Sequence, residues 1–414
     1  MSNNNKTPAI RFKGFTDTWE QHKLGDHSEI VAGGTPNTGH PEYWNPKEIP
    51  WMSSGEINNK VIYSTDNMIS KIGFSNSSAK WVKEKSVLIA LAGQGKTRGT
   101  VAISEIPLTT NQSIAAIQPD SFLYYKFLFQ NLEERYNELR EVSSGDGTRG
   151  GLNKQIISDL EVLAPEIQEQ IKIGDFLCGI DTLITLHQRK YDKLIQFKAA
   201  MLKKMFPQNG ANKPEIRFKG FTDAWEQREL GDMGRTYTGL SGKTKDDFGH
   251  GQARFVTYMN VFSNPICNSE MTEPIEIDSK QNEVEIGDVF FTTSSETPEE
   301  VGMSSVLLKK QGKTYLNSFC FGFRPSEKID SYYLAYMLRS EAIRAKIILL
   351  AQGISRYNIS KNKVMEIAVS LPSLDEQAQI GQYFTHLDRL ITLHQRKCDK
   401  YKSIKSGLLK KLFP

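Results

Sequence analysis

One eight-residue stretch occurs twice in this chain, and this repeat constrains the fold more than any other feature. Residues 183–190 and 390–397 both read Leu-Ile-Thr-Leu-His-Gln-Arg-Lys, at a shift of 207 positions. Each copy lies in a longer segment, from about residue 165 to 205 and from about residue 372 to 412, in which apolar residues recur at steps of three and four. That spacing places them on one face of a helix and predicts two long helices.

A narrow apolar stripe of this kind suits helices that pack against each other as a coiled coil. Aligning the two segments at the same shift gives matching positions, which predict the seam between the helices. The histidines of the seam are interpreted as satisfied core residues rather than metal ligands, because no cluster of carboxylates or cysteines accompanies them. The predicted seam residues are Phe176, Ile180, Leu183, His187, Tyr191 and Leu194 in the first helix and Tyr383, Leu387, Leu390, His394, Cys398 and Tyr401 in the second.

A second repeat shows that nearly half of the chain is duplicated. Residues 10–17 and 216–223 both read Ile-Arg-Phe-Lys-Gly-Phe-Thr-Asp, and both copies continue into Trp-Glu-Gln and Leu-Gly-Asp. A direct repeat of this length indicates two copies of one module. Within each copy, apolar runs of strand length, such as residues 86–90 and 288–291, alternate with turn residues and precede a helix. The predicted fold class is α+β, with two tandemly repeated α+β domains that are each followed by a long helix.

The domain boundaries follow from the repeats. Residues 207–214, with two prolines, a glycine and two asparagines, have the composition of a linker. Between their shared landmarks the two copies hardly agree in sequence, which indicates domains that are built alike but recognise different things. The predicted segments are residues 1–162 for the first domain, 163–207 for the first helix, 208–370 for the second domain and 371–414 for the second helix.

Composition and length exclude several classes of protein. A chain of 414 residues is too long for one ordinary core, and its net charge of +4 is compatible with nucleic acid without indicating it. The polar start lacks the apolar run of a signal peptide, and no stretch has the apolar length of a membrane span, so we expect a cytoplasmic protein without membrane contact. The scattered cysteines predict reduced, mostly buried thiols rather than disulfides or a metal site. They are Cys178, Cys267, Cys320 and Cys398.

One motif suggests nucleotide binding but does not fit it. Residues 90–97, Ala-Leu-Ala-Gly-Gln-Gly-Lys-Thr, follow a predicted strand and match a relaxed phosphate-loop pattern. A phosphate loop must open a helix whose amide groups hold the phosphates, whereas residues 98–103 favour another strand. The corresponding positions of the second module have no Gly-Lys-Thr. We therefore expect a polar loop that presents Gln94, Lys96, Thr97 and Arg98 outward.

Signatures of catalysis are missing together. The sequence has no Asn/Asp-Pro-Pro-Tyr/Phe motif of an amino-methyltransferase, no glycine-rich loop suited to a methyl-donor cofactor and no acidic metal cluster of a nuclease. The chain is therefore not expected to be an enzyme alone.

The helix segment after each repeated histidine is strongly basic. Each carries only one acid, Asp192 or Asp399. Such a face is either a solvated surface or a docking face for an acidic partner or DNA phosphates, and its duplication suggests two equivalent partners. The basic residues are Arg189, Lys190, Lys193, Lys198, Lys203 and Lys204 in the first helix and Arg396, Lys397, Lys400, Lys402, Lys405, Lys410 and Lys411 in the second.

Several landmarks form one recognisable set. They are the Trp-Glu-x-x-x-Leu-Gly-Asp starts at Trp19 and Trp225, Gly33-Gly34-Thr35-Pro36, Ile49-Pro50-Trp51, Thr110-Asn111-Gln112, Gly147-Thr148-Arg149, Leu163-Ala164-Pro165, Glu169-Gln170-Ile171, and Glu376-Gln377 with Ile380. This set, covering nearly the whole chain, resembles the specificity subunit of a Type I restriction–modification system. One departure is that the Gly-Gly-Thr-Pro turn is replaced by residues 238–242 in the second module, where base contacts should then differ.

The resemblance implies a function and a set of partners. Each domain would be a target-recognition domain for one half of a bipartite double-stranded DNA target, and the helices would pack antiparallel as a spacer that relates the domains by a pseudo-two-fold axis. One chain would then bind two methyltransferase subunits, which direct adenine methylation. With restriction subunits the complex would cut unmodified DNA. The chain itself would bind no cofactor, since S-adenosylmethionine, ATP and Mg belong to the partners.

Two other classes stay open from the residues alone: a coiled-coil scaffold without sequence specificity, and a self-sufficient DNA enzyme. If the chain does read DNA, polar positions in turn-rich segments are the candidates, because Arg and Lys suit guanine and Asn or Gln suit adenine. The predicted DNA-binding residues are Gln94, Lys96, Thr97, Arg98 and Arg149 in the first domain and Lys243, Lys245, Tyr258, Thr293, Ser294, Ser295, Arg356, Tyr357 and Asn358 in the second.

Overall fold

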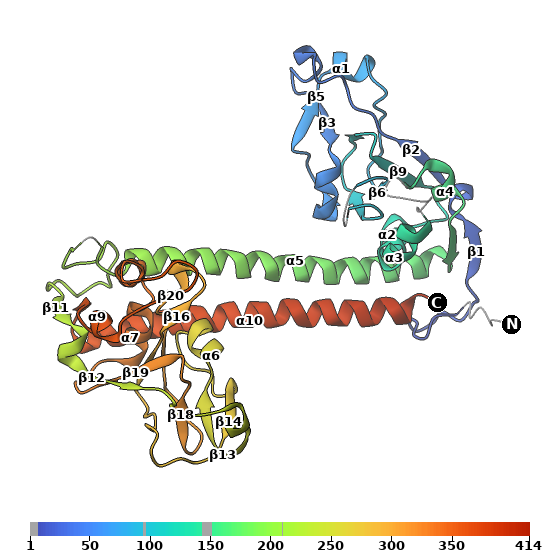
Figure 1. Ribbon diagram of the computed structural model, residues 1–414. Helices are drawn as coiled ribbons and strands as arrows, with labels where there is room; N and C mark the ends of the chain where they lie inside the picture. Colours follow the sequence, from blue (N-terminus) through green and yellow to red (C-terminus); the bar gives the residue numbers. More distant parts are fainter. Residues whose placement is uncertain (1–6, 94–96, 143–150, 209) are drawn as a thin grey trace. The chain divides into compact units, whose positions relative to one another are not determined.

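The computed structural model describes residues 7–93, 97–142, 151–208 and 210–414 of the chain. It divides into two compact units, each of which contains one α+β domain and parts of both long helices (Figure 1). Unit 1 consists of residues 1–188 and 396–414, and unit 2 of residues 189–395. The long helices are α5 (Ile167–Lys204) and α10 (Leu374–Leu412), close to the predicted ranges. In the parts of the chain described here, no helix has the length and apolar character needed to span a membrane.

Domain 1, the α+β region before α5, is built on two sheets. The larger has the strand order β2-β9-β6-β7-β4, and its neighbours are antiparallel except for the parallel pair β4 and β7. Its strands are β2 (Ser28–Ala32), β9 (Ile114–Pro119), β6 (Ser86–Ala90), β7 (Val101–Ser104) and β4 (Val61–Ile62). The smaller sheet consists of β5 (Asn67–Ile69), β3 (Ile49–Met52) and β8 (Thr109–Thr110). The short helices are α1 (Lys71–Ser75), α2 (Tyr125–Glu134), α3 (Tyr136–Val142), α4 (Lys154–Ser158), η1 (Leu24–Asp26), η2 (Pro41–Tyr43) and η3 (Ser54–Asn59).

Domain 2, between α5 and α10, repeats this topology although its sequence has diverged. Its larger sheet has the order β12-β19-β15-β17, which corresponds to β2-β9-β6-β7 of domain 1. These strands are β12 (Gly234–Thr238), β19 (Cys320–Pro325), β15 (Val289–Thr292) and β17 (Ser304–Val306). The smaller sheet consists of β14 (Thr272–Ile275), β13 (Phe248–Val256) and β18 (Thr314–Leu316), and a further pair is β16 (Ser294–Ser295) with β20 (Tyr357–Asn358). The short helices are α6 (Tyr258–Ser263), α7 (Ser331–Met337), α8 (Glu341–Ile348), α9 (Lys361–Met365), η4 (Leu230–Met233), η5 (Lys245–Asp247) and η6 (Pro298–Glu300).

The prediction of an α+β fold with two repeated domains and two long helices is confirmed. Each domain has two short helices where the sequence suggested a single helix, α2 and α3 in domain 1 and α7 and α8 in domain 2. All four cysteines are free, and three of them are buried. Burial raises the pKa of Cys267 to about 12, so this thiol stays protonated at neutral pH, as the sequence suggested.

The repeated tryptophan begins a two-stranded connection that joins each domain to its long helix. In unit 1, β1 (Glu20–Lys23) pairs antiparallel with β10 (Glu161–Ala164), which leads into α5. In unit 2, β11 (Glu226–Glu229) pairs in the same way with β21 (Ala368–Leu371) before α10. This pairing explains why Trp-Glu-Gln occurs in both copies.

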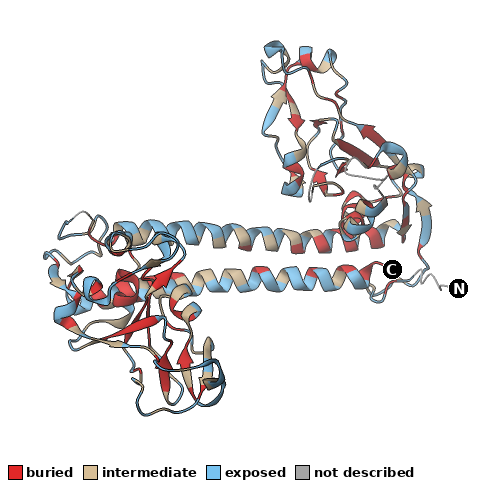
Figure 2. Ribbon diagram, in the orientation of Figure 1, coloured by how far each residue is buried: buried red, intermediate tan, exposed pale blue. Residues whose placement is uncertain are grey.

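The end of each long helix completes the core of a domain that is not its own. In unit 1, Leu412 and Phe413 at the end of α10 are buried in one cluster with Trp19 and Phe127 of domain 1. In unit 2, the ring of Phe206, after α5, stacks on that of Phe384 and makes an edge contact with Trp225 of domain 2. Figure 2 shows buried residues gathered in the sheets and at the helix ends that lie against them, while the middle stretches of both helices are more exposed.

The repeated Ile-Arg-Phe-Lys-Gly-Phe-Thr-Asp segment is a clasp between the two helices. In unit 1, the Ile10 amide donates to the Lys411 carbonyl at the end of α10, at 3.1 Å. The next residue, Arg11, donates from Nε and Nη2 to both carboxylate oxygens of Glu169 near the start of α5, at 2.9 and 2.6 Å. Its third nitrogen, Nη1, donates to the Asp17 carbonyl at 2.7 Å. The clasp therefore ties the end of one helix to the beginning of the other.

Unit 2 contains the same clasp with the helices exchanged. The Ile216 amide donates to the Lys204 carbonyl at the end of α5, and Arg217 donates to both oxygens of Glu376 near the start of α10, at 2.7 Å each. Gly14 and Gly220 adopt φ values of 103° and 104° at the turn of each clasp, a conformation that favours glycine. Identical geometry explains why this segment occurs twice without change.

The helices run antiparallel, and two of the twelve predicted seam residues, Phe176 and Leu183, are exposed instead. In unit 1, Leu177, Ile180 and His187 are buried on α5, whereas Phe176 and Leu183 are 45% and 37% exposed. The prediction of Phe176 and Leu183 as seam residues is therefore wrong. The sequence could not decide which of two adjacent apolar residues faces the other helix, because both fit the same steps of three and four. These adjacent pairs are Phe176-Leu177, Leu183-Ile184, Tyr383-Phe384 and Leu390-Ile391.

Other predicted seam residues do lie between the helices. In unit 1 the ring of His187 stacks on Tyr401 at 5.7 Å between centroids, and Cys398 is buried beside Gln188. In unit 2 Leu387 is buried in the core of the unit. The half-buried members of the predicted set are Tyr191, Leu194, Tyr383, Leu390, His394 and Tyr401.

Because the two helix ends are equivalent, one half of the chain should pair with itself. We expect a fragment of residues 1–207 to form a homodimer in which Met205 and Phe206 of one copy replace Leu412 and Phe413 in the core of the other. Sedimentation equilibrium measures the mass directly. A matched fragment that ends at residue 190 lacks these side chains and should stay monomeric. A strictly monomeric 1–207 fragment would contradict the helix pairing.

Candidate nucleic-acid interface

Two loops meet at the same place in both domains. In domain 1 the Leu91 amide, just after β6, donates to Ser113, and the Leu91 carbonyl accepts from the Leu152 amide before α4. In domain 2 the Thr293 amide, just after β15, donates to Phe319, and the Thr293 carbonyl accepts from the Ile359 amide before α9. The four hydrogen bonds are 2.8 to 3.0 Å long. The fold therefore brings the loop after the central strand and the loop before the last short helix together in each domain.

In domain 2 this place gathers most of the residues predicted to contact DNA. β16 and β20 pair antiparallel, with Ser294 opposite Asn358 and Ser295 opposite Tyr357. From α6, the hydroxyl of Tyr258 donates to the Ser294 carbonyl at 2.8 Å. Burial raises the pKa of Tyr258, so the phenol remains a neutral donor at physiological pH.

A short hairpin carries the exposed cation of this group. The Gln352 and Asn358 backbones exchange hydrogen bonds at 2.9 and 2.8 Å and close a loop around Arg356. Gly353 has a φ of 140°, and a Cβ there would lie 2.0 Å from the Arg356 carbonyl oxygen, so a side chain at this position is excluded. Arg356 is exposed and donates to the Ser294 hydroxyl at 3.3 Å. The hairpin thus presents a guanidinium, which suits guanine or a phosphate.

Two of the predicted contact residues have another role. Ser294 and Ser295 are buried, with 6% and 8% of their surface exposed. Ser294 accepts the hydrogen bond from Arg356, and Ser295 donates to Glu300. Direct contact of these hydroxyls with bases is therefore contradicted. Their small side chains hold the hairpin in place, and polarity alone could not distinguish this role from an exposed one.

Two half-buried arginines hold the surrounding loops in domain 2. Arg344 of α8 donates to the carbonyls of Glu299, Val301 and Gly302, in the loop after β16, at 2.7 to 2.9 Å. Arg339 donates to four carbonyls around the end of α6 and β17, at 2.7 to 3.0 Å. Burial lowers the pKa of both arginines to about 10, and both remain charged at neutral pH. Sequence analysis missed them.

The two predicted lysines of domain 2 lie elsewhere. Lys243 is mostly buried and bonds to Asp278 at 2.9 Å, with Asp247 at 3.6 Å. This pairing lowers the pKa of Asp278. With its charge engaged inside the domain, Lys243 is not available as an outward base contact, and that prediction is wrong. Lys245, at the start of η5, is exposed.

In domain 1, the described residues test only part of the prediction. Gln94, Lys96 and Arg149 lie outside the described residues. Thr97 and Arg98 are half-buried, in a turn where the Thr100 amide donates to the Thr97 carbonyl at 3.0 Å. The chain then enters strand β7 rather than a helix, as the argument against a phosphate loop required.

Three exposed apolar side chains around the domain 2 hairpin were also missed. Met259 follows Tyr258 on α6, Phe319 precedes β19, and Ile354 lies within the hairpin loop. Ile354 is 96% exposed. The sequence analysis weighed only polar positions, although apolar groups also contact thymine methyls in a DNA groove.

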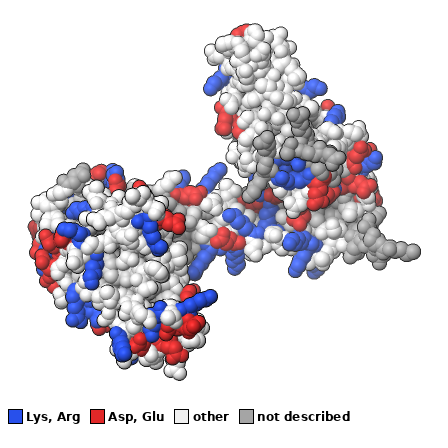
Figure 3. Space-filling model, in the orientation of Figure 1, with Lys and Arg blue, Asp and Glu red and all other residues white. Residues whose placement is uncertain are grey.

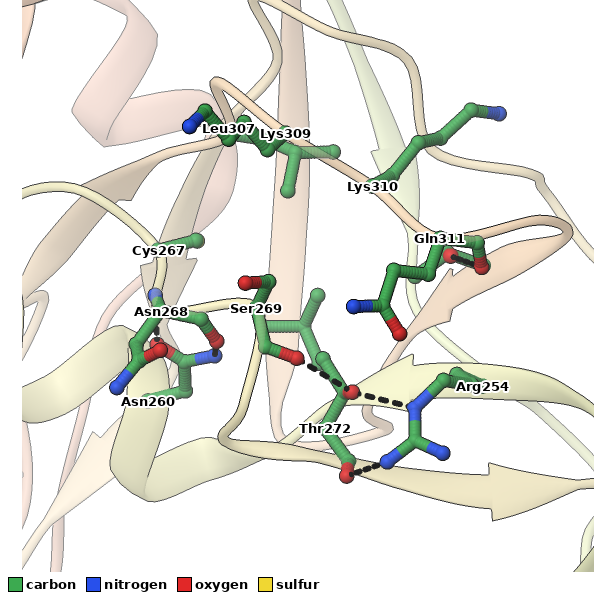
Figure 4. Close-up of a pocket in the computed structure, with 12 residues that line it drawn as sticks. Arg254, Asn260, Cys267, Asn268, Ser269, Thr272, Leu307, Lys309, Lys310 and Gln311 are labelled. Carbon is green, nitrogen blue, oxygen red and sulfur yellow. Dashed lines mark hydrogen bonds between the residues drawn. The ribbon is translucent and has the colours of Figure 1, made fainter.

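A small hollow lies between β13, β14 and β18 (Figure 4). Arg254 lines it and donates from Nε to the Thr272 hydroxyl at 2.6 Å, and Lys309 and Gln311 line the same hollow. Its volume of about 10 Å³ has room for about one water molecule. It is therefore too small for a nucleotide or a methyl-donor cofactor. Within the described ranges, no group of three or more His, Cys, Asp or Glu side chains could hold a metal ion.

The basic side chains of the long helices do not all form one outward face. Lys198 bonds to Asp388 and Lys405 to Asp181, and both lysines are largely buried. These two positions therefore do not belong to the solvated or docking face considered from the sequence. Figure 3 shows Lys and Arg side chains interspersed with Asp and Glu side chains on the face drawn.

Comparisons with known proteins relate this chain to one protein family. The profile of the Type I restriction modification DNA specificity domain matches residues 16–196 and 222–401, which is most of the chain. The MjaVIII specificity subunit of Methanocaldococcus jannaschii is 22% identical over 95% of this chain and 91% of its own length. The MjaIX specificity subunit of the same organism is 29% identical over 55% of this chain, and that match spans only 54% of the relative's length.

A solved structure has the same fold. The S subunit of a Type I restriction–modification system from M. genitalium matches with a TM-score of 0.62 over 99% of both chains, at 14% sequence identity. Each of the two profile matches covers one α+β domain and most of the long helix that follows it. The chain belongs to the family of Type I restriction–modification DNA specificity proteins.

Proposed function

We propose that each domain of this chain reads one half of a bipartite double-stranded DNA target. The observation that carries the proposal is the pair of equivalent loop sites with different residues. The backbone hydrogen bonds at Leu91 and Thr293 follow the same pattern, whereas the sequences that follow these two residues have no motif in common. Arg149 and Arg356 occupy matching positions at the shift of 207, and the neighbours of each arginine differ. A common frame with different loops suits two different half-sites.

The partners of the chain are two copies of one methyltransferase subunit, docked on the long helices. Each unit exposes a matched pair of apolar side chains, one from each helix. In unit 1 these are Leu186 on α5 and Ile404 on α10, and in unit 2 they are Leu393 on α10 and Phe197 on α5, with 39–46% of each side chain exposed. The exposed Lys190 of α5 follows on the same stripe. Two equivalent patches fit two identical partners.

The chemistry then belongs to the partners. S-adenosylmethionine on the methyltransferase subunits would supply the methyl group for adenine, and restriction subunits would use ATP and Mg to cut unmodified DNA. This chain would contribute the choice of sequence to a complex in the cytoplasm. A scaffold without specificity and a self-sufficient DNA enzyme are the two rival functions.

Base-resolution sequencing of adenine methylation tests the proposal. The chain would be expressed in a methylation-free host with and without a matching methyltransferase subunit. We expect a split motif that is methylated on both strands only when both proteins are present. Methylation by this chain alone would make it an enzyme. A bound methyltransferase that leaves the DNA unmethylated, or methylates it without a split motif, would support the scaffold.

The hairpin of domain 2 should set the bases of one half-site. Replacing Arg356 with alanine should cost about 1–3 kcal/mol of recognition and relax specificity in that half-site only. The measurement is the methylated fraction across a library of variant half-sites. Arg235→Ala, at an exposed position on β12, is the matched control and should leave the motif unchanged. Equal weakening on all sequences would instead identify Arg356 as a phosphate contact.

The apolar patches should determine how many methyltransferase subunits bind. Leu186→Ser or Leu393→Ser should weaken one of the two binding events about tenfold, since each removes one exposed leucine that the partner would cover. Analytical ultracentrifugation of the complex would show one bound subunit instead of two at limiting concentration. Ile195→Ser is the control, because Ile195 is also exposed but lies on the face of α5 opposite to Leu186. Normal binding of two subunits by both leucine variants would exclude this docking surface.

A further inference from the structure

Each unit contains an ion pair that joins the two long helices, largely buried in unit 1 and half-buried in unit 2. In unit 1, Lys405 of α10 donates to both carboxylate oxygens of Asp181 on α5, at 2.7 and 2.6 Å. In unit 2, Lys198 of α5 donates to Asp388 on α10 at 2.5 Å. The lysines match at the shift of 207, and so do the aspartates. The same pair is therefore made twice, with the roles of α5 and α10 exchanged.

A third side chain ties the recognition domain to each pair. In unit 1, Gln130 of α2 donates from Nε2 to Asp181 at 2.7 Å. In unit 2, the hydroxyl of Tyr336 on α7 donates to Asp388 at 2.8 Å. Gln130 and Tyr336 occupy equivalent positions in the two domains, at the shift of 206. We call each set of aspartate, lysine and domain residue a charge junction.

The cations also contact aromatic rings of the domain helices. Lys405 lies 5.9 Å from the ring centre of Phe129, and Lys198 lies 5.2 Å from that of Tyr336. In unit 1 the junction extends further into domain 1, because Glu133 of α2 bonds to both Lys405 and Lys60. Burial alone would raise the pKa of Glu133, but the two lysines outweigh it and lower this pKa. Lys405 is thus held by the domain as well as by α5.

Stability does not explain why these charges recur. Burying a lysine and an aspartate costs desolvation free energy, and an apolar pair of similar volume often stabilises a fold as well or better. What a buried, directional ion pair supplies is a single geometry. Here that geometry relates three elements: the two long helices and the domain helix that lies on them.

We propose that the charge junctions fix the placement of each recognition domain on the helix pair, and so set the number of base pairs allowed between the two half-sites. This inference rests on the proposed bipartite recognition. Each base pair added between half-sites moves one of them by about 3.4 Å along the DNA and turns it by about a tenth of the roughly 10–10.5 base-pair helical turn. A domain that can shift by a few ångström on its helices would accept a neighbouring spacing. Gln130, Asp181, Tyr336, Asp388, Lys198 and Lys405 are therefore positioning residues for spacing.

The test uses the full chain in complex with its methyltransferase subunit. The DNA library keeps both half-sites and varies the spacer by one or two base pairs around the native length. In unit 2, Lys198→Met combined with Tyr336→Phe removes two of the three junction groups and leaves Asp388 partly hydrated. We expect methylation at the neighbouring spacer lengths to rise about tenfold, the equivalent of one charge-assisted hydrogen bond, with the half-site bases unchanged.

Unit 1 provides an independent variant, and a mild variant guards against misfolding. Lys405→Met with Asp181→Asn removes the charges of that junction while Gln130 keeps an acceptor, and it should relax the same spacer preference. Tyr336→Phe alone removes one hydroxyl and should give a smaller change in the same direction. Lys203→Met is the matched control, because Lys203 pairs with Glu341 of domain 2 on the exposed surface at 3.1 Å. It should keep the native spacer.

The possible outcomes separate the inference from the proposed function. If the unaltered chain gives no split motif, bipartite recognition fails and the inference fails with it. If the motif is split but the folded junction variants keep the native spacer preference, the inference alone is overturned. A change in the half-site bases would also overturn it, since the junctions would then act on the reading loops.

Discussion

Neither recognition domain closes its core without the helix that follows the other domain. Phe413, at the end of α10, is buried against Trp19 in unit 1, and Phe206, after α5, is buried against Trp225 in unit 2. Burial of one such aromatic side chain contributes about 1.5–3 kcal/mol. Each domain therefore gains stability only when the antiparallel helix pair has formed. Folding of each domain and pairing of the helices are therefore coupled, and the segment repeated at the start of each domain contributes to both because it contacts both helices.

The clasps make this pairing specific. Glu169 and Glu376 are almost fully buried, and each receives two hydrogen bonds from one arginine. Leaving such a carboxylate without its partner costs about 3–5 kcal/mol, because the charge stays buried. A helix start can therefore accept only a segment that brings an arginine to this place. Since the same segment also caps the end of the opposite helix, one short sequence fixes both helices at once.

The sequence predicted the architecture because repeats and periodicity are properties of the chain itself. It failed where the outcome depended on which of two neighbouring residues faces inward. Phe176 and Leu177 fit the same helical steps, and only the three-dimensional packing selects Leu177. Likewise Ser294 and Arg356 looked equally suited to contact DNA, yet the first is buried and supports the second. The charge junctions were hidden for the same reason, because a lysine within a basic stretch looks solvated until its partner on another helix is known.

The separation of frame and loops connects this packing to recognition. The residues that hold the frame, such as the clasps and the core aromatic side chains, contact both helices and cannot change singly without leaving a cavity or an unpaired charge. The loops that begin at Leu91 and Thr293 are anchored there by backbone hydrogen bonds, which do not depend on the side chains of those residues. Side chains between those ends can therefore vary without loss of the fold. That freedom explains how two domains of one topology came to differ so much in sequence.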